Sequence, residues 1–260
     1  RGGTFDFLPQ NLPFYLCRNV VYWSYGVRDG VPISRVESFD RKYGLEKLSE
    51  VANRSGARNV QILLAVGGYI EDYAQLSLLG RDAAALSRFA HYAMMLMQSH
   101  FLHGVVVHWI EGEPLCKYSA VDDGQVLRTV FSSLRQIFQL NSFSGQLAAI
   151  VSTGSTTGYA VVDTILDIIN IVFIEARNEW HSVNIDTDMC SAWGQNVLRI
   201  ITSLPLHPAG NAKFGVVMSA APLMVEAHTS SHGQLVFDRI SNSSSYGSAP
   251  GLGSVWDMCG

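Results

Sequence analysis

The sequence lacks two features that would assign it to a common class at once. Its 18 Lys and Arg residues are scattered among 22 Asp and Glu residues, and the formal net charge is -4. A nucleic-acid-binding surface needs concentrated positive charge, so we expect no nucleic-acid partner. No apolar run reaches the roughly 20 residues that cross a bilayer, since residues 60–66 and 165–174 are short or interrupted by charge. We therefore expect no membrane span.

Cysteine is also scarce. The four cysteines are Cys17, Cys116, Cys190 and Cys259, and none of them lies close to another in the sequence. Zinc and redox motifs need closely spaced pairs, so these cysteines do not form one. Disulfides and buried thiols both remain open.

Two acceptor sequons for N-glycosylation begin at Asn53 and Asn242. The chain starts at Arg1 instead of Met, as a processed product does. Together these features favour a secreted, extracellular glycoprotein.

What the sequence does contain is an alternation of apolar strands and amphipathic helices. With 260 residues, 48% of them hydrophobic, it has the size of a single α/β barrel domain spanning residues 1–260. This alternation predicts an α/β fold with a parallel sheet. We expect strands at 19–25, 60–66, 104–109, 146–151, 168–174, 214–218 and 254–256, and helices at 43–52, 82–98, 122–140, 161–166 and 192–204.

One strand invites a functional interpretation. Residues 104–109 form an apolar run that leads into a polar segment with Glu111 and Glu113. A buried parallel strand that ends in carboxylates is typical of the functional edge of a sheet. The question is which chemistry this edge supports.

Four strand ends resemble those of glycoside hydrolase family 18, the chitinases and chitinase-like proteins. Their order and spacing match the family from Phe5 onward, and the resemblance implies a (β/α)8 TIM-type barrel. The matching segments are 17–26 (CRNVVYWSYG), 62–69 (ILLAVGGY), 167–175 (DIINIVFIE) and 253–256 (GSVW). They are similar to the family's second strand ending in Tyr-Ala-Phe-Ala-Gly, its third strand Leu-Leu-Ser-x-Gly-Gly-Trp, its sixth strand Asp-Phe-Ile-Asn-Val-Met-Thr-Tyr-Asp and its eighth strand with a tryptophan.

The family's fourth strand carries Asp-Gly-x-Asp-x-Asp-x-Glu, in which the glutamate is the general acid. By this resemblance the aspartates fall on His103, Val106 and His108, and the glutamate falls on Ile110. The family hydrolyses by substrate assistance, in which a carboxylic acid protonates the leaving oxygen. Isoleucine has no proton to give, so the resemblance implies a catalytically inactive protein.

Two nearby glutamates could replace the missing acid. Side chains alternate along a strand, so Val106, His108 and Ile110 should share the barrel-facing side while Glu111 points away. Glu113 lies beyond a two-residue insertion relative to the family pattern. Glu111 and Glu113 could be displaced catalytic acids or solvated loop carboxylates, and the sequence favours solvated loop carboxylates.

An inward histidine such as His108 can act as an acid or bind a metal. No second and third ligand follow neighbouring strands in the sequence, which favours a hydrogen-bonded core histidine. We expect neither a metal nor another cofactor.

The resemblance implies a partly eroded sugar cleft. Trp256, Tyr69 and Glu175 are its glycan-binding candidates, while Ser24 replaces a phenylalanine of the family. Aromatic faces bind the apolar faces of sugars, but both aromatic residues could equally be packing residues. By strand alternation, Trp109 should face the helices.

Two departures from the family concern architecture. The family's first strand has no counterpart here, so we expect either that it was cleaved off or that a partner chain covers its place. The stretch 222–252 is too short for the α+β insertion domain of deep-cleft chitinases.

Cys116 and Cys190 follow the fourth and sixth strands, and the resemblance favours a disulfide between them.

Three functions remain open from the sequence. The first is a non-catalytic chitinase-like protein that binds a chitin-type, N-acetylglucosamine-containing oligosaccharide or a protein partner. The second is a structural or assembly subunit whose barrel another chain completes or covers at the missing-strand edge. The third is an atypical glycoside hydrolase that uses Glu113 or Glu111 as a displaced acid.

Overall fold

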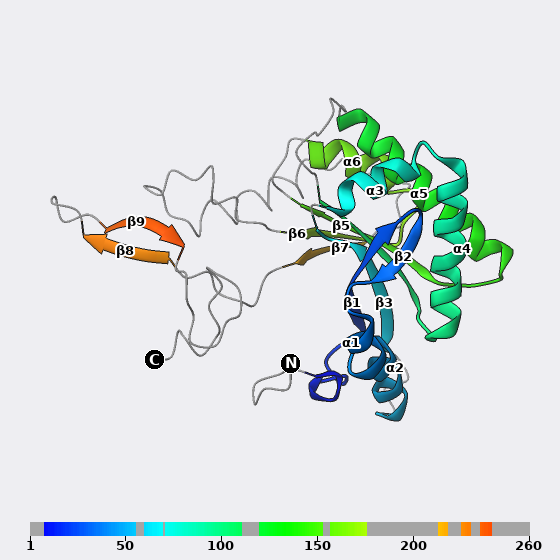
Figure 1. Cartoon of the computed structure of the whole chain (residues 1–260), viewed down its shortest axis with the longest axis horizontal. Coiled ribbons are helices and arrows are strands. Elements are labelled where there is room, and N and C mark those ends of the chain that lie inside the picture. Colours follow the sequence, from blue (N-terminus) through cyan, green and yellow to red (C-terminus); the bar gives the residue numbers. More distant parts are fainter. Residues whose placement is uncertain are drawn as a thin grey trace.

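The computed structural model describes residues 8–55, 60–69, 71–110, 120–152, 157–175, 213–217, 225–229 and 235–240. At its centre lies a seven-stranded sheet in the order β2-β1-β3-β4-β5-β6-β7 (Figure 1). All neighbouring strands from β1 to β7 run parallel, and β2 alone pairs antiparallel, with β1. The strands are β1 (Asn19–Arg28), β2 (Val31–Ser34), β3 (Gln61–Gly67), β4 (Gly104–Trp109), β5 (Gln146–Ser152), β6 (Ile171–Glu175) and β7 (Lys213–Val217).

Helices connect most of the parallel strands. After a 3-10 turn at Pro9–Asn11, they are α1 (Glu37–Lys42), α2 (Leu45–Arg54), α3 (Asp72–Leu79), α4 (Ala83–Ser99), α5 (Ala120–Leu140) and α6 (Thr157–Ile165). The start of α4 is fixed by Asp82, whose carboxylate accepts hydrogen bonds from the backbone N–H groups of Ala84 and Ala85 at 2.9 and 3.0 Å. No helix among the described residues is both long and apolar enough to cross a membrane.

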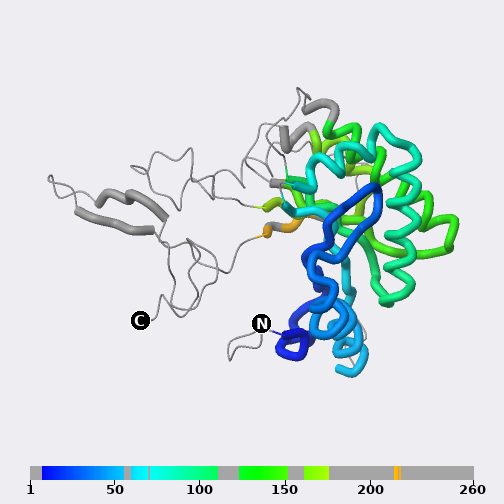
Figure 2. Tube along the Cα trace, in the orientation of Figure 1, coloured from blue at the N-terminus to red at the C-terminus, as the bar shows by residue number. Residues whose placement is uncertain are grey.

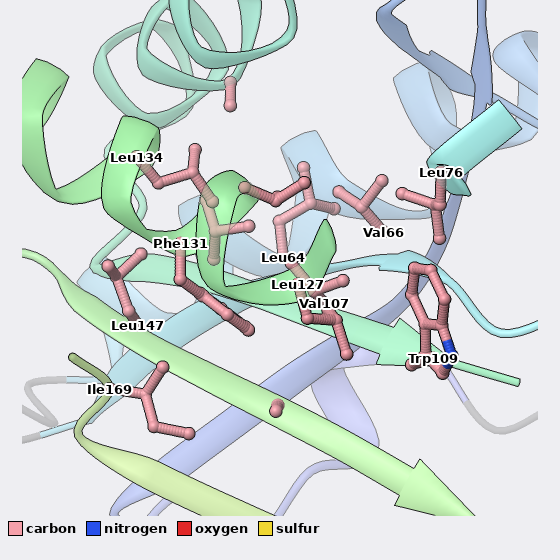
Figure 3. Packing of buried hydrophobic residues seen from close by; sticks show 14 of the residues in the cluster. Leu64, Val66, Leu76, Val107, Trp109, Leu127, Phe131, Leu134, Leu147 and Ile169 are labelled. Atoms are coloured by element: carbon pink, nitrogen blue, oxygen red, sulfur yellow. The ribbon is translucent and has the colours of Figure 1, made fainter. Parts of the chain in front are cut away.

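The face of the sheet covered by these helices, here called the outer face, holds the main core. Alternate strand residues point to it because side chains alternate along a strand. They pack against apolar residues of α5, as Figure 3 shows for Leu64, Val107, Leu127, Phe131 and Leu147. Trp109 lies in the same cluster at 3% exposure, with its ring edge-on to Tyr73 at 5.4 Å between centroids. The prediction that Trp109 faces the helices is confirmed.

The opposite, inner face carries a smaller apolar cluster. It consists of Leu63, Ala65, Val106, Ala148 and Ile150, each adjacent in sequence to residues of the outer cluster. Val106 therefore faces inward, as the alternation along β4 predicts.

The predicted βα alternation and parallel sheet are confirmed, and the sheet also contains a strand that the sequence did not predict. It is β2, which forms a hairpin with β1 through Asp29 and Gly30, with φ of 51° and 76°. Two consecutive positive φ values fit the two-residue turns preferred in hairpins, and Asp-Gly is a typical sequence for them. The hairpin turn lies beside α4 (Figure 2). There Arg88 Nε donates to the Asp29 carbonyl at 3.1 Å.

Several predicted elements differ or are not described. Among the described residues the sheet is open, with β2 and β7 at its ends. Two further strands, β8 (Val225–Thr229) and β9 (Leu235–Ile240), pair antiparallel in a separate sheet, within a stretch expected to be only a connection. The predicted helix 192–204 and strand 254–256 lie outside the described residues.

Candidate functional site

The carboxyl ends of β3, β4 and β6 bring Tyr69, His108 and Glu175 together with Trp23 from the middle of β1. We call these four residues the mouth. His108 is 3% exposed, yet both ring nitrogens have partners. Trp23 Nε1 donates to His108 Nδ1 at 2.9 Å, and His108 Nε2 lies 3.1 Å from Glu175 Oε2.

These partners fix the protonation of His108. An indole N–H can only donate, so Nδ1 must be the unprotonated acceptor. Nε2 then carries the hydrogen and donates it to the Glu175 carboxylate. His108 is a neutral, fully hydrogen-bonded buried histidine, which confirms the prediction of a core histidine.

Trp23 and Tyr69 form an exposed aromatic pair at the mouth. Their ring centroids are 5.0 Å apart and their planes differ by 17°, which is a stacked arrangement. Trp23 is 48% exposed and Tyr69 is 39% exposed, so a large part of both rings is open to solvent. The Arg35 guanidinium carbon lies 4.0 Å from the centroid of the Tyr69 ring, within cation–π range.

Arg35 and Asp72 anchor this pair to the fold. The Arg35 guanidinium donates to the Asp72 carboxylate, to the Gly67 carbonyl at 3.3 Å and to Ser24 Oγ at 3.2 Å. The same carboxylate accepts the backbone N–H of Tyr69 at 3.1 Å. The aromatic pair is thus positioned by charged groups that are themselves largely buried.

Gly68 makes the contact between Trp23 and His108 possible. Its φ is +95°, a conformation that residues with a side chain rarely adopt. A Cβ atom there would lie 2.5 Å from Trp23 Nε1 and 2.7 Å from His108 Nδ1. The Gly67-Gly68 pair of the sequence is therefore needed for the hydrogen bond between these two side chains.

Neither Ile110 nor His108 has a free proton to donate at the mouth. Ile110 is buried at 7% exposure and carries no proton donor. The His108 hydrogen is already donated to Glu175. The part of the chain that the structure describes holds no group of three or more His, Cys, Asp or Glu residues placed to bind a metal. Glu111 and Glu113 lie outside the described residues.

The other predicted site residues are distributed as follows. His103 lies at the opposite end of β4 from the mouth, where its Nδ1 accepts from the Ile62 backbone N–H at 3.1 Å. Asn53 is exposed in the last turn of α2. Its glycosylation stays a prediction. Cys17 is a partly buried free thiol. The candidates that lie outside the described residues are Cys116, Cys190, Asn242 and Trp256.

Sequence reasoning missed Trp23, because the family resemblance directed attention to Ser24. The alternation of side chains along β1 could have placed Trp23 on the inner face. Val21 packs against the inner cluster and Tyr22 against the outer one, so the next residue, Trp23, points inward. After Tyr22 the pairing with β3 shifts by one residue, and a cis peptide joins Trp23 to Ser24. This bulge returns Tyr25 to the outer face.

Similarity to known proteins is found in structure alone. No family model and no curated protein matches the sequence. Among solved structures, the chain is similar to the Group IV chitinase of Ostrinia furnacalis in complex with allosamidin, with a TM-score of 0.80 and 16% identity over 100% of this chain and 73% of that one.

Two further solved structures are similar. Catalytic domain 2 of the Ostrinia furnacalis Group II chitinase has a TM-score of 0.76 and 18% identity over 98% of this chain and 70% of that one. An immunomodulatory active chitinase from Trichuris suis has a TM-score of 0.72 and 13% identity over 100% of this chain and 73% of that one. The chain therefore has a chitinase-like fold.

Proposed function

We propose that this protein is a non-catalytic, secreted chitinase-like protein that binds an N-acetylglucosamine-type oligosaccharide at the mouth. The observation that carries the proposal is the exposed, stacked pair of Trp23 and Tyr69 at the carboxyl ends of the strands. Ligands of parallel α/β folds bind at this edge of the sheet. Solved structures with this fold include a chitinase in complex with allosamidin.

The physical basis is aromatic contact with a sugar ring. The C–H face of a pyranose is apolar, and an exposed indole or phenol face removes it from water. Trp23 is held in place by its hydrogen bond to His108, and Tyr69 by Arg35 and the Asp72 carboxylate. Because these rings are fixed before binding, little side-chain entropy is lost when a sugar stacks on them.

Absence of catalysis is supported by the polar groups of the mouth. The family acid position is Ile110, and the neutral His108 donates its hydrogen to Glu175. A proton donor must lie within hydrogen-bond reach of the leaving oxygen, and neither residue offers one. Purified protein should therefore release no sugar from chitin oligosaccharides at acidic to neutral pH. Turnover that Glu113→Gln abolishes would refute this part of the proposal.

Binding is tested by calorimetric titration with chitin oligosaccharides. We expect saturable binding that Trp23→Ala and Tyr69→Ala each weaken about tenfold, since about 1.4 kcal/mol of aromatic contact is lost. Tyr92→Ala is the matched control, because Tyr92 is 40% exposed, close to the 39% of Tyr69, but lies on α4. Equal loss of affinity in Tyr92→Ala and Tyr69→Ala would contradict the proposal, as would no binding by the wild type.

A second candidate function is assembly with another chain. β2 pairs with β1 only over Tyr25–Arg28, so among the described residues Asn19–Tyr22 pair on one side alone, with β3. An unpaired strand edge is a template for another strand. Near it, Tyr15 and Leu16 are 87% and 71% exposed. A stably folded monomer at micromolar concentration, measured by sedimentation, would refute the assembly function and leave glycan binding intact.

A further inference from the structure

A cavity lies on the outer face of the sheet. It has a volume of about 180 Å³ and is bordered by β1, β2, α1, α2 and the residue that ends α4, His100. Tyr25 and Leu45 form apolar walls and belong to the outer core cluster. No residue of the mouth lines this cavity, so the two features are distinct.

The cavity carries an excess of negative charge. Three carboxylates line it, from Glu37, Asp40 and Glu46, against the single fixed cation of Arg41. Arg41 is already paired with Glu37, at 2.5 Å between Nη2 and Oε1. Glu46 forms no ion pair or hydrogen bond with any part of the chain that the structure describes. Two carboxylates are therefore left without a cation.

The Tyr25 hydroxyl is a further polar group of this cavity. Tyr25 is 6% exposed, and its hydroxyl makes no hydrogen bond within the described residues. The nearby Tyr22 hydroxyl differs, because it donates to the Asp40 carboxylate, which also accepts from Ser34 Oγ. A hydroxyl that lines a cavity and has no partner in the described part of the chain offers a ligand one donor and one acceptor position.

The electrostatic environment of Tyr25 is also anionic. Burial, and after it the charges of Asp40, Glu46 and Glu37, together raise the pKa of its hydroxyl to about 12. The three carboxylates thus act together on the position of this hydroxyl.

We propose that this cavity binds a primary ammonium group carried on a short aliphatic chain. The ammonium has three N–H donors, and Asp40, Glu46 and the Tyr25 hydroxyl oxygen offer acceptors for them. The Tyr25 ring and Leu45 would contact the aliphatic stem, as apolar walls do for lysine stems elsewhere. A metal ion fits less well, because the described residues include no group of three or more His, Cys, Asp or Glu residues placed to hold one.

Such a group could come from a free alkylamine or from the lysine side chain of a partner protein. The chemistry is the same, so the two sources are separated by the probe. n-Butylamine represents the free amine, and N-acetyl-lysine methylamide represents the side chain within a peptide. n-Butanol has a similar shape without the charge and serves as the neutral control.

The experiment follows the backbone amide resonances of Ser34 and Gly44, which flank the cavity, during titration of the full chain at neutral pH. We expect a saturable shift with n-butylamine and none with n-butanol. Added salt should weaken the binding, because the attraction is largely electrostatic. Binding of N-acetyl-lysine methylamide as well would assign the site to a lysine side chain. Failure of that probe alone would assign it to free amines.

Two variants test the proposed contacts. Glu46→Gln should weaken n-butylamine binding at least about fivefold because it removes a negative charge, and Tyr25→Phe about threefold because it removes an acceptor. Asp163→Asn is the matched control: it removes the same charge from the exposed surface of α6. Unchanged melting temperatures would show that the variants fold.

Three outcomes would overturn the proposal. They are absence of a saturable shift with n-butylamine, equal shifts with n-butanol, and equal weakening by Glu46→Gln and Asp163→Asn. Glycan binding at the mouth is measured separately and uses none of these residues. Failure of the ammonium site would therefore leave the proposed function untouched, and the reverse also holds.

Discussion

The two faces of the sheet differ in how far their apolar character extends along the strands. The outer face is apolar from one end of the strands to the other, from Leu102 before β4 to Trp109 at its end. The inner face is apolar only midway, around Leu63 and Val106, and becomes polar at the carboxyl ends with His108 and Glu175.

This difference assigns stability mainly to the outer face and ligand binding to the carboxyl end of the inner face. A continuous apolar face packed against helices supplies most of the buried area, and burial of that area stabilises the fold. The polar end of the inner face contributes less buried area but supplies hydrogen bonds and exposed rings. Substitutions on the two faces should therefore affect different measurements.

The largest effect should come from the middle of the outer face. Leu64 is 1% exposed, so Leu64→Ala should lower the free energy of unfolding by about 2–5 kcal/mol, measured by urea denaturation. Oligosaccharide affinity of the folded protein should not change. Leu78→Ala is the control, because Leu78 is 52% exposed on α3 and its loss should cost less than about 1 kcal/mol. Equal costs for both variants would remove the distinction between the faces.

The next effect concerns the charged pair beneath the aromatic rings. Asp72→Asn leaves the Arg35 cation without its carboxylate partner and should cost about 2 kcal/mol of unfolding free energy. This is less than for a fully buried pair, because the Arg35 side chain keeps 24% exposure. Glu71→Gln should cost under about 0.5 kcal/mol, since Glu71 is exposed and 3.9 Å from Arg35. A smaller loss in Asp72→Asn than in Glu71→Gln would show that the pair does not anchor the mouth.

A third substitution tests the close approach at the mouth. Gly68→Ala places a Cβ against Trp23 and His108 at a positive φ, and should cost about 1–2 kcal/mol. The indole N–H resonance of Trp23 should move, because its hydrogen bond to His108 is disturbed, and oligosaccharide affinity should fall. An unchanged resonance would mean that the hydrogen bond does not depend on this glycine.

The smallest effect appears only at high pH. The pKa of Tyr25 is raised from 10.0 in an ordinary tyrosine to about 12 in the folded chain. The unfolded chain therefore ionises Tyr25 first, and stability that is fully present below pH 10 is lost as the pH rises through 12. Tyr25→Phe should make this decline shallower, as measured by urea denaturation across that range. Parallel curves for wild type and Tyr25→Phe above pH 10 would contradict the raised pKa.

Much of the fold was predictable because the parallel strands are buried on both faces and so appear as apolar runs. The short helices α1 and α3, of 6 and 8 residues, were missed because neither has enough turns to show a clear apolar stripe. The β1–β2 hairpin was missed although Asp29-Gly30 is a typical turn sequence. That error left the order of strands at this edge of the sheet unpredicted.

The site was less predictable, because its contacts join distant parts of the chain. The family resemblance named Tyr69 and Glu175 as candidates, but it did not identify the residues that contact them. The hydrogen bonds of His108 reach 85 residues back to Trp23 and 67 residues forward to Glu175. Such pairs depend on the register of strands that the sequence does not encode locally.

The bulge in β1 also has a consequence for sequence alignment. Tyr22 pairs with Leu64 and Tyr25 with Val66, so three steps along β1 correspond to two along β3. An alignment without gaps can match residues on both sides of this bulge only if the other protein carries the same extra residue. Otherwise the alignment is displaced by one residue after Trp23. The apparent loss of an aromatic residue at Ser24 would then result from this displacement and not from a substitution. Comparisons of this strand should therefore count residues separately on the two sides of the bulge.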